Sequence, residues 1–183
     1  MILVKNKLKL KDLIIYAIFA AVTAICSQIT LPLPFTPVMV SLGTFAIMLT
    51  SALCSVKFKF GGLVSVFIYI GLGAVGMPVF QGFRGGLGVL IGPTGGYIVG
   101  YLLMAIVIGF MYSDRKFINI LALILADVVL YICGTLWFML STGNGLWQSL
   151  MLCVIPFLPG DLVKLIAAYL TIGRIKPLIN KMR

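Results

Sequence analysis

Residues 117–140 read FINILALILADVVLYICGTLWFML, a long apolar run in which Asp127 is the one charged side chain. About 20 consecutive apolar residues let a helix cross the hydrocarbon core of a bilayer, where every backbone N–H and C=O must be paired within the protein. The run therefore predicts a transmembrane helix. Five further runs of this kind surround it: 13–31, 38–56, 60–75, 93–112 and 159–177. The sequence thus predicts an all-α, polytopic membrane protein with six transmembrane helices in a single domain, residues 1–183.

The overall composition agrees with a membrane protein. Of the 183 residues, 62% are hydrophobic and 10% are charged, and the mean hydropathy is +1.20. A soluble domain carries roughly 25% charged and 45–50% apolar residues. These values exclude an ordinary soluble globule, a disordered chain and a small secreted module held together by disulfides.

The basic residues predict the orientation of the chain. With six spans, twelve of the fourteen cations fall on one side of the membrane, Arg84 alone falls on the other, and Lys164 lies inside the last span. The positive-inside rule makes the crowded side, and both termini, cytoplasmic. The net charge of +10 therefore reflects topology and not a nucleic-acid partner. The twelve are Lys5, Lys7, Lys9, Lys11, Lys57, Lys59, Arg115, Lys116, Arg174, Lys176, Lys181 and Arg183.

Several classes of chemistry lack the residues that they need. Histidine and glutamate are absent, and no two of the four cysteines form a CxxC pair, so we predict no metal site and no catalytic residue. The chain also has no GxxxxGK[ST] phosphate loop, because the segment 92–96 lacks the lysine. We predict no cofactor and no ATP hydrolysis by this chain.

Asp161 and Lys164 form the most informative pair. They are three residues apart at the outer start of the last span, so they share one helix face. Ionisable groups inside a membrane segment are costly and usually functional. The pattern favours a ligand-binding role, and a mutual salt bridge or a helix cap accounts for it as well. The two interpretations are compatible.

A second candidate site lies in the glycine-rich segment between the third and fourth spans. Arg84 would hold a carboxylate, and the aromatic ring of Phe80 would pack against an apolar ring system. Gly86 would let backbone N–H groups approach a ligand. A flexible interfacial loop with a snorkelling arginine explains the segment equally well.

Asp127 lies near mid-depth of its span, with Tyr131 one turn further on the same face. A carboxyl group facing lipid would be costly. We therefore expect it to bond a neighbouring helix, with a ligand or proton-relay role as the alternative.

Small residues repeat every four positions in two spans, at Gly92, Gly96 and Gly100 and at Ala17 and Ala21. Such stripes allow helices to approach closely in lipid. We expect the glycines to pack within this chain, whereas the alanines fit either internal packing or docking to another subunit.

Two connecting segments carry further expectations. The proline-rich loop Leu31–Pro37 cannot be helical and would cap a pocket or simply join two spans. Ser141–Leu158 is too apolar for a free loop, so we expect it to lie at the membrane interface or to fold back over the bundle.

Four stretches carry a family resemblance: Gly76-Met77-Pro78-Val79-Phe80, Arg84 to Gly88, Gly92-Pro93-Thr94-Gly95-Gly96-Tyr97 and Pro156-Phe157-Leu158-Pro159-Gly160-Asp161-Leu162-Val163-Lys164. In this order they resemble the BioY family, the biotin-binding S components of energy-coupling-factor (ECF) vitamin transporters.

The resemblance implies an S-component-like bundle in a prokaryotic cell membrane that captures biotin with high affinity on the outer side. It implies a transmembrane coupling (T) protein and two cytoplasmic ATPases as partners, with Ala17 and Ala21 on the docking face. Loops 31–37 and 82–88 would close over the ligand. The biotin-binding residues that it implies are Asp161, Lys164, Arg84, Phe80, Gly86 and Thr94.

The chain departs from the family pattern after the proline-rich loop. Where the family often reads Thr-Leu-Gln-Thr, this chain reads Ser41-Leu42-Gly43-Thr44, so the glutamine amide is missing. Two alternatives to biotin capture stay open: an S component for another vitamin, and a stand-alone, proton-coupled secondary transporter that uses Asp127.

Overall fold

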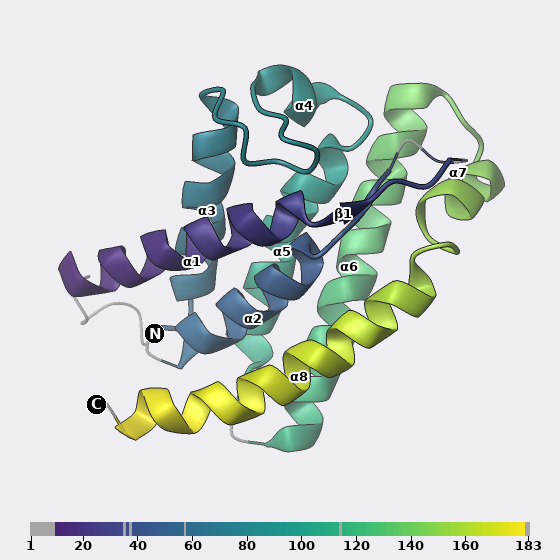
Figure 1. Ribbon diagram of the computed structural model, residues 1–183. Coiled ribbons are helices and arrows are strands. Elements are labelled where there is room, and N and C mark those ends of the chain that lie inside the picture. Colours follow the sequence, from purple (N-terminus) through teal and green to yellow (C-terminus); the bar gives the residue numbers. More distant parts are fainter. Residues whose placement is uncertain (1–9, 35, 37, 57, 114, 182–183) are drawn as a thin grey trace, which may run out of the picture.

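The computed structural model describes residues 10–34, 36, 38–56, 58–113 and 115–181 (Figure 1). Some residues used above lie outside the described ones, namely Lys5, Lys7, Lys9, Phe35, Pro37, Lys57 and Arg183. The described chain is mostly helical. Its elements in order are α1 (Leu10–Gln28), β1 (Thr30–Leu31), β2 (Val40–Ser41), α2 (Gly43–Ser55), α3 (Gly61–Ala74), α4 (Leu87–Ile91), α5 (Gly95–Met111), α6 (Lys116–Thr142), α7 (Leu146–Cys153) and α8 (Leu158–Lys181).

The predicted helical class is confirmed, with local differences at the ends of the spans. The second span begins as a strand, because Thr30–Leu31 pairs antiparallel with Val40–Ser41 across the proline-rich loop. The helix α2 therefore starts only at Gly43. The last span is longer than expected, since α8 continues past Pro177.

The apolar segment 141–158 folds back onto the bundle, which is one of the two arrangements expected from the sequence. It contains the short helix α7, and the Tyr97 hydroxyl of α5 donates to the backbone oxygen of Cys153 at 2.8 Å. The side chains of Val38, Phe138, Cys153 and Phe157 form a small apolar cluster under this segment.

Length and hydropathy alone qualify two helices of the described chain, α1 and α6, as membrane spans, and the pair α7–α8, bent by 51°, as a third. The helices α2, α3 and α5 are apolar but shorter. The 13 residues of α2 rise about 20 Å, less than the roughly 30 Å of hydrocarbon. This helix is buried along nearly its whole length, so neighbouring helices rather than lipid surround it.

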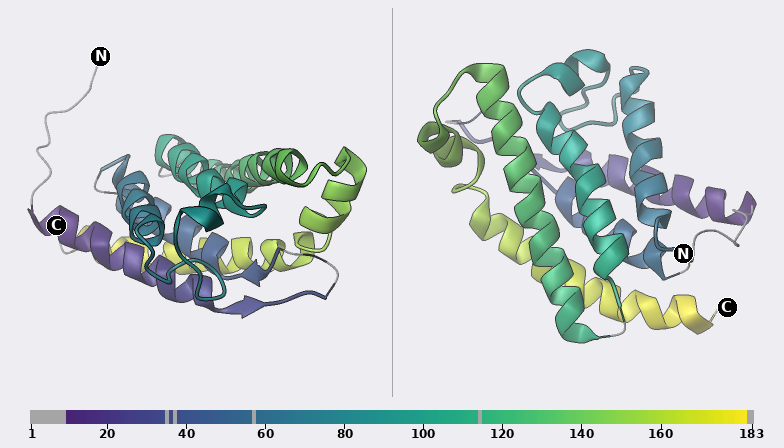
Figure 2. Two further views of the ribbon diagram at one scale, coloured as in Figure 1. Left: turned by 90° about the horizontal axis from the view of Figure 1, so that it is seen from above. Right: turned by 180° about the vertical axis from the view of Figure 1, so that it is seen from behind.

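The helix α2 lies at the centre of the bundle. It packs against α1, α3, α5 and α8, and its Ile47 and Met48 are fully buried in the main apolar core. Figure 2 shows α1 and α8 on one side of the molecule and α3, α5 and α6 on the other. The start of α1 and the end of α8 lie on the side away from α4, α7 and the strand pair (Figure 1).

The glycine stripe packs inside the chain, in agreement with the prediction for Gly96 and Gly100. A Cβ atom at Gly96 would overlap Trp137 of α6, and one at Gly100 would lie 2.8 Å from Leu130. Gly92 precedes α5, and its backbone oxygen accepts the Trp137 indole N–H at 3.0 Å. These contacts bring α5 and α6 together along most of their length.

We predict that Gly96→Ala destabilises the fold by about 1–3 kcal/mol, because the added methyl overpacks the contact with Trp137. Thermal unfolding of the purified protein in detergent measures the change. The matched control is Gly71→Ala in α3, where a Cβ would meet nothing within 4 Å. An unchanged melting temperature for Gly96→Ala would contradict the packing argument.

Candidate functional site

One cavity gathers most of the residues predicted to bind a ligand. Residues of the Phe80–Arg84 loop, of β2 and of the surrounding helices line it, and about 770 Å³ of atom-free space, open solvent included, lies among them. Six of the predicted residues line it: Asp161, Lys164, Arg84, Phe80, Thr94 and Tyr131.

Asp161 and Lys164 form a buried ion pair in the cavity wall. The Lys164 Nζ donates to Asp161 Oδ1 at 2.7 Å, and the two residues are 7% and 5% exposed. The Tyr131 hydroxyl of α6 donates to Asp161 Oδ2. A buried ion pair is tolerated when its polar atoms have hydrogen-bond partners. Both oxygens of the Asp161 carboxylate have one, in Lys164 and Tyr131.

The ion pair sits where α8 begins. Asp161 lies in the first turn of α8, and its backbone N–H donates to Phe157 O at 2.8 Å. The partial positive charge of a helix N-terminus favours a carboxylate there. The expected salt bridge is therefore present, and Lys164 keeps further N–H donors for a group in the cavity.

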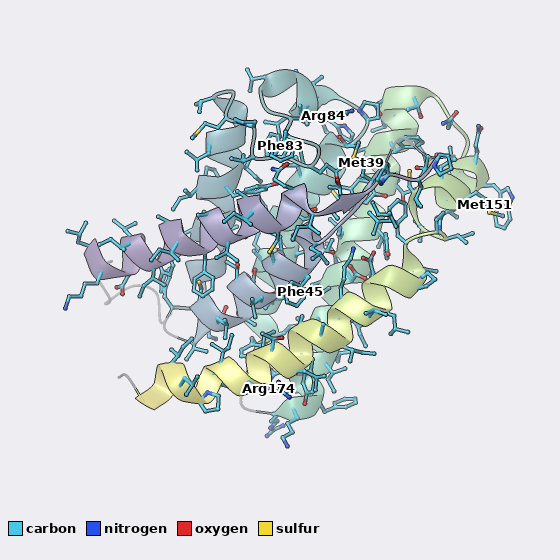
Figure 3. The ribbon with its side chains drawn as sticks, in the orientation of Figure 1. Met39, Phe45, Phe83, Arg84, Met151 and Arg174 are labelled. Carbon is cyan, nitrogen blue, oxygen red and sulfur yellow. The ribbon has the colours of Figure 1, made fainter. Side chains whose placement is uncertain are left out.

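The second candidate segment forms a tight loop at the cavity mouth. Phe80 and Arg84 exchange two backbone hydrogen bonds, of 2.9 and 3.3 Å. Gly82 and Phe83 turn the chain with positive φ angles of 72° and 55°. The Arg84 side chain is exposed at this end of the molecule (Figure 3), so a carboxylate bound to it would remain close to water.

Phe80 is buried beneath this loop. Its ring packs edge-on against Tyr69 of α3, with centroids 5.5 Å apart, and Gly73 leaves room for it. It supplies an apolar wall of the cavity.

Gln28, at the end of α1, fixes the loop and was not identified from the sequence. Its Nε2 lies within 2.9–3.3 Å of the backbone oxygens of Pro78, Val79 and Phe80. Its Oε1 accepts the Phe83 N–H at 2.8 Å. The only signal in the sequence was an amide at the end of an apolar run, and nothing there identified its distant partners.

Two predicted residues lie away from the cavity wall. Gly86 has a φ angle of 91°, and its N–H donates to Gly73 O at 2.7 Å, so it shapes the loop before α4. Asp127 is buried in α6, and its Oδ1 has no hydrogen-bond partner among the described residues. The expected bond from Asp127 to a neighbouring helix is therefore not seen at this atom.

The alanine stripe of α1 faces outward. Ala17 and Ala21 are exposed, while Ala20 between them is buried. Ile14, Ile18 and Ile25 are also exposed on this helix. These small and apolar residues leave an apolar surface that lipid or another membrane protein would cover.

Comparisons with known proteins agree with one another. The model of the BioY family matches residues 4–181. A probable biotin transporter BioY of Pyrococcus horikoshii is 32% identical, over 92% of this chain and 98% of that protein. A biotin transporter BioY of Thermotoga maritima is 35% identical over the same shares of the two chains.

A solved structure has the same fold. It is the crystal structure of the S-component for biotin from an ECF-type ABC transporter, with a TM-score of 0.83 and 27% sequence identity. The superposition covers 96% of this chain and 95% of that one.

We predict that Gln28→Ala loosens the Phe80–Arg84 loop, because the Phe83 N–H loses its acceptor and three carbonyl groups lose a shared donor. Hydrogen exchange at the Phe83 amide should become about tenfold faster or more. The matched control is Gln148→Ala, a substitution at an exposed glutamine of α7. Exchange at Phe83 equal to that of the unsubstituted chain would contradict the role of Gln28.

Proposed function

This chain belongs to the BioY family, and on that premise we propose that it is the biotin-capturing S component of an ATP-driven, ECF-type vitamin transporter. It binds the vitamin and catalyses no reaction itself. The observation that carries the proposal is the buried Asp161–Lys164 pair in the wall of the cavity. Relatives named as biotin transporters and a biotin S component of the same fold support it.

The chemistry of biotin matches the groups around the cavity. Its ureido ring needs both an acceptor and donors, and Asp161 and Lys164 offer these side by side. Its sulfur-containing ring needs an apolar wall, to which Phe80 contributes. Its carboxylate needs a cation, and Arg84 at the mouth supplies one. Thr94 adds a hydroxyl to the wall, while Gly86 shapes the adjoining loop.

Six membrane spans with both termini in the cytoplasm accompany this function. The six longer helices account for the spans, and burial of the short helix α2 explains how it lies within a bilayer. The described cations Lys59 and Arg115 lie in the connections between α2 and α3 and between α5 and α6, and Lys116 is the first residue of α6. We place this end of the helices on the cytoplasmic side. The chain is then a multi-pass protein of a prokaryotic cell membrane.

Transport requires partners that this chain does not contain. A transmembrane coupling protein would dock on the exposed Ala17 and Ala21 face of α1, and two cytoplasmic ATPases would drive release of biotin into the cell. The Gly82–Gly88 and Leu31–Pro37 loops would close over biotin before docking.

Asp161→Ala and Lys164→Ala test the binding site. Each removes a group that would pair with the ureido ring, and leaving a buried polar group of biotin without its partner costs about 1–3 kcal/mol. We therefore expect biotin affinity, measured by calorimetry on the detergent-purified protein, to fall by about 5- to 150-fold. Arg174→Ala, at an exposed position of the same helix, is the control and should bind as the unsubstituted chain does. Undiminished affinity in both cavity variants would refute the assigned site.

Ala21→Trp separates binding from docking. The bulky ring would disturb an interface on α1 without reaching the cavity, so biotin binding should persist while uptake with the partner subunits is lost. Ile132→Trp, at an exposed position of α6, is the control. Loss of biotin binding in Ala21→Trp would instead assign the stripe to folding.

The buried Asp127 Oδ1, which has no hydrogen-bond partner within the described part of the chain, is the observation that favours the alternative, a stand-alone proton-coupled transporter. Under the proposed function, Asp127→Asn keeps biotin affinity, and uptake with the partner subunits continues. Biotin uptake by this chain alone that an uncoupler and Asp127→Asn both abolish would establish the alternative. An S component for another vitamin would bind that vitamin in place of biotin.

A further inference from the structure

Five hydroxyl groups converge on the cavity from five different elements. They belong to Ser27 of α1, Ser41 of β2, Thr44 of α2, Tyr69 of α3 and Tyr101 of α5. Each of these residues is buried, and each lines the cavity. We call them the hydroxyl cluster. None of them carries a formal charge, in contrast to the Asp161–Lys164 pair and Arg84.

Gly43 leaves open the space at the centre of the hydroxyl cluster. A Cβ atom built on Gly43 would lie 3.0 Å from Ser27 Oγ, 3.0 Å from Tyr101 Oη and 3.2 Å from Ser41 Oγ. Three hydroxyl oxygens on separate elements therefore surround the position that a larger residue would fill. A side chain at residue 43 would displace them.

The hydroxyl cluster retains unused hydrogen-bonding capacity. The Tyr69 hydroxyl donates to Ser27 Oγ at 3.2 Å, and the Gly43 N–H donates to Ser41 Oγ at 3.3 Å. Thr44 Oγ1 has no partner among the described residues, although it is buried. A hydroxyl group both donates and accepts, and a buried one without a partner is costly, so the hydroxyl cluster favours a polar occupant.

The chemistry of the cluster selects the kind of group that it takes. A carboxylate buried here would lack a countercharge of its own, because none of the five residues is cationic and Lys164 is already paired with Asp161. Such burial is unfavourable. A neutral group that both donates and accepts would be satisfied. In biotin that group is the ureido ring, because the carboxylate is charged and the sulfur-containing ring is mostly apolar.

We propose that Ser27, Ser41 and Tyr101, converging around Gly43, form a second polar subsite that holds the ureido ring of biotin together with Asp161 and Lys164. This subsite rests on the proposed function. It makes Tyr101 and Gly43 determinants of specificity for a neutral, cyclic urea.

Tyr101→Phe and Gly43→Ala test the subsite. The first removes one hydroxyl, and the second places a methyl among three hydroxyls while leaving a residue that favours helix. Each should weaken biotin binding about tenfold, measured by calorimetry on the purified full chain. Tyr16→Phe, which removes the hydroxyl of a buried tyrosine that does not line the cavity, should bind biotin as the unsubstituted chain does.

Biotin methyl ester identifies which end of the ligand the subsite holds. Because the ester keeps the ureido ring, Tyr101→Phe should weaken its binding by the same factor as that of biotin. A penalty for biotin that disappears for the ester would mean that the cluster holds the carboxylate, and this would overturn the proposal. Affinities of both variants within twofold of the unsubstituted chain would overturn it as well.

Biotin binding by the unsubstituted chain separates a failure of the proposed function from a failure of the subsite. If it fails to bind biotin, the proposed function fails and the subsite fails with it. If it binds biotin while Tyr101→Phe and Gly43→Ala both bind equally well, only the subsite fails.

Discussion

The pairing of a carboxylate with an ammonium group inside an apolar bundle is the constraint on which the site depends. Removing either charge from water is costly, so each needs a partner that the surrounding structure holds in place. Asp161 has two such partners, Lys164 from its own helix and Tyr131 from α6. The contact between α6 and α8 is thus fixed by a polar requirement as well as by apolar packing.

The packing of the bundle meets this requirement through small residues. Gly96 and Gly100 let α5 approach α6, and this contact positions the α6 face that carries Tyr131. On the opposite wall, the buried helix α2 packs against α8 and carries Gly43 and Thr44 at its start. Small residues therefore have two effects here, because they bring helices together and leave space for the cavity between them.

The sequence predicted the features that depend on composition and local spacing. Apolar runs located all six longer helices, and spacing along one helix predicted the Asp161–Lys164 pair. It did not predict the contacts of Gln28, whose partners are about fifty residues away in a loop without periodicity.

The hydroxyl cluster was also missed, for a related reason. Serine, threonine and tyrosine within apolar runs are common, and only the folded bundle shows which of them face a shared space. The strand pair was missed because its two strands are two residues each, too short to show alternation. When side chains from several helices and strands face one shared space, the sequence of each single helix or strand does not show it.

The distribution of charge along the cavity fits a ligand that has an uncharged polar ring at one end and a carboxylate at the other. Its deep wall combines neutral hydroxyls with an ion pair whose charges offset each other, so a polar but uncharged ring can be buried there without an unpaired charge. Arg84 lies on an exposed loop at the mouth. A carboxylate held there keeps part of its hydration, and its binding does not require the large cost of moving a free charge into the bundle. In the proposed binding mode, the Gln28 contacts would contribute to affinity, because they hold the backbone of the loop from which the Arg84 side chain projects.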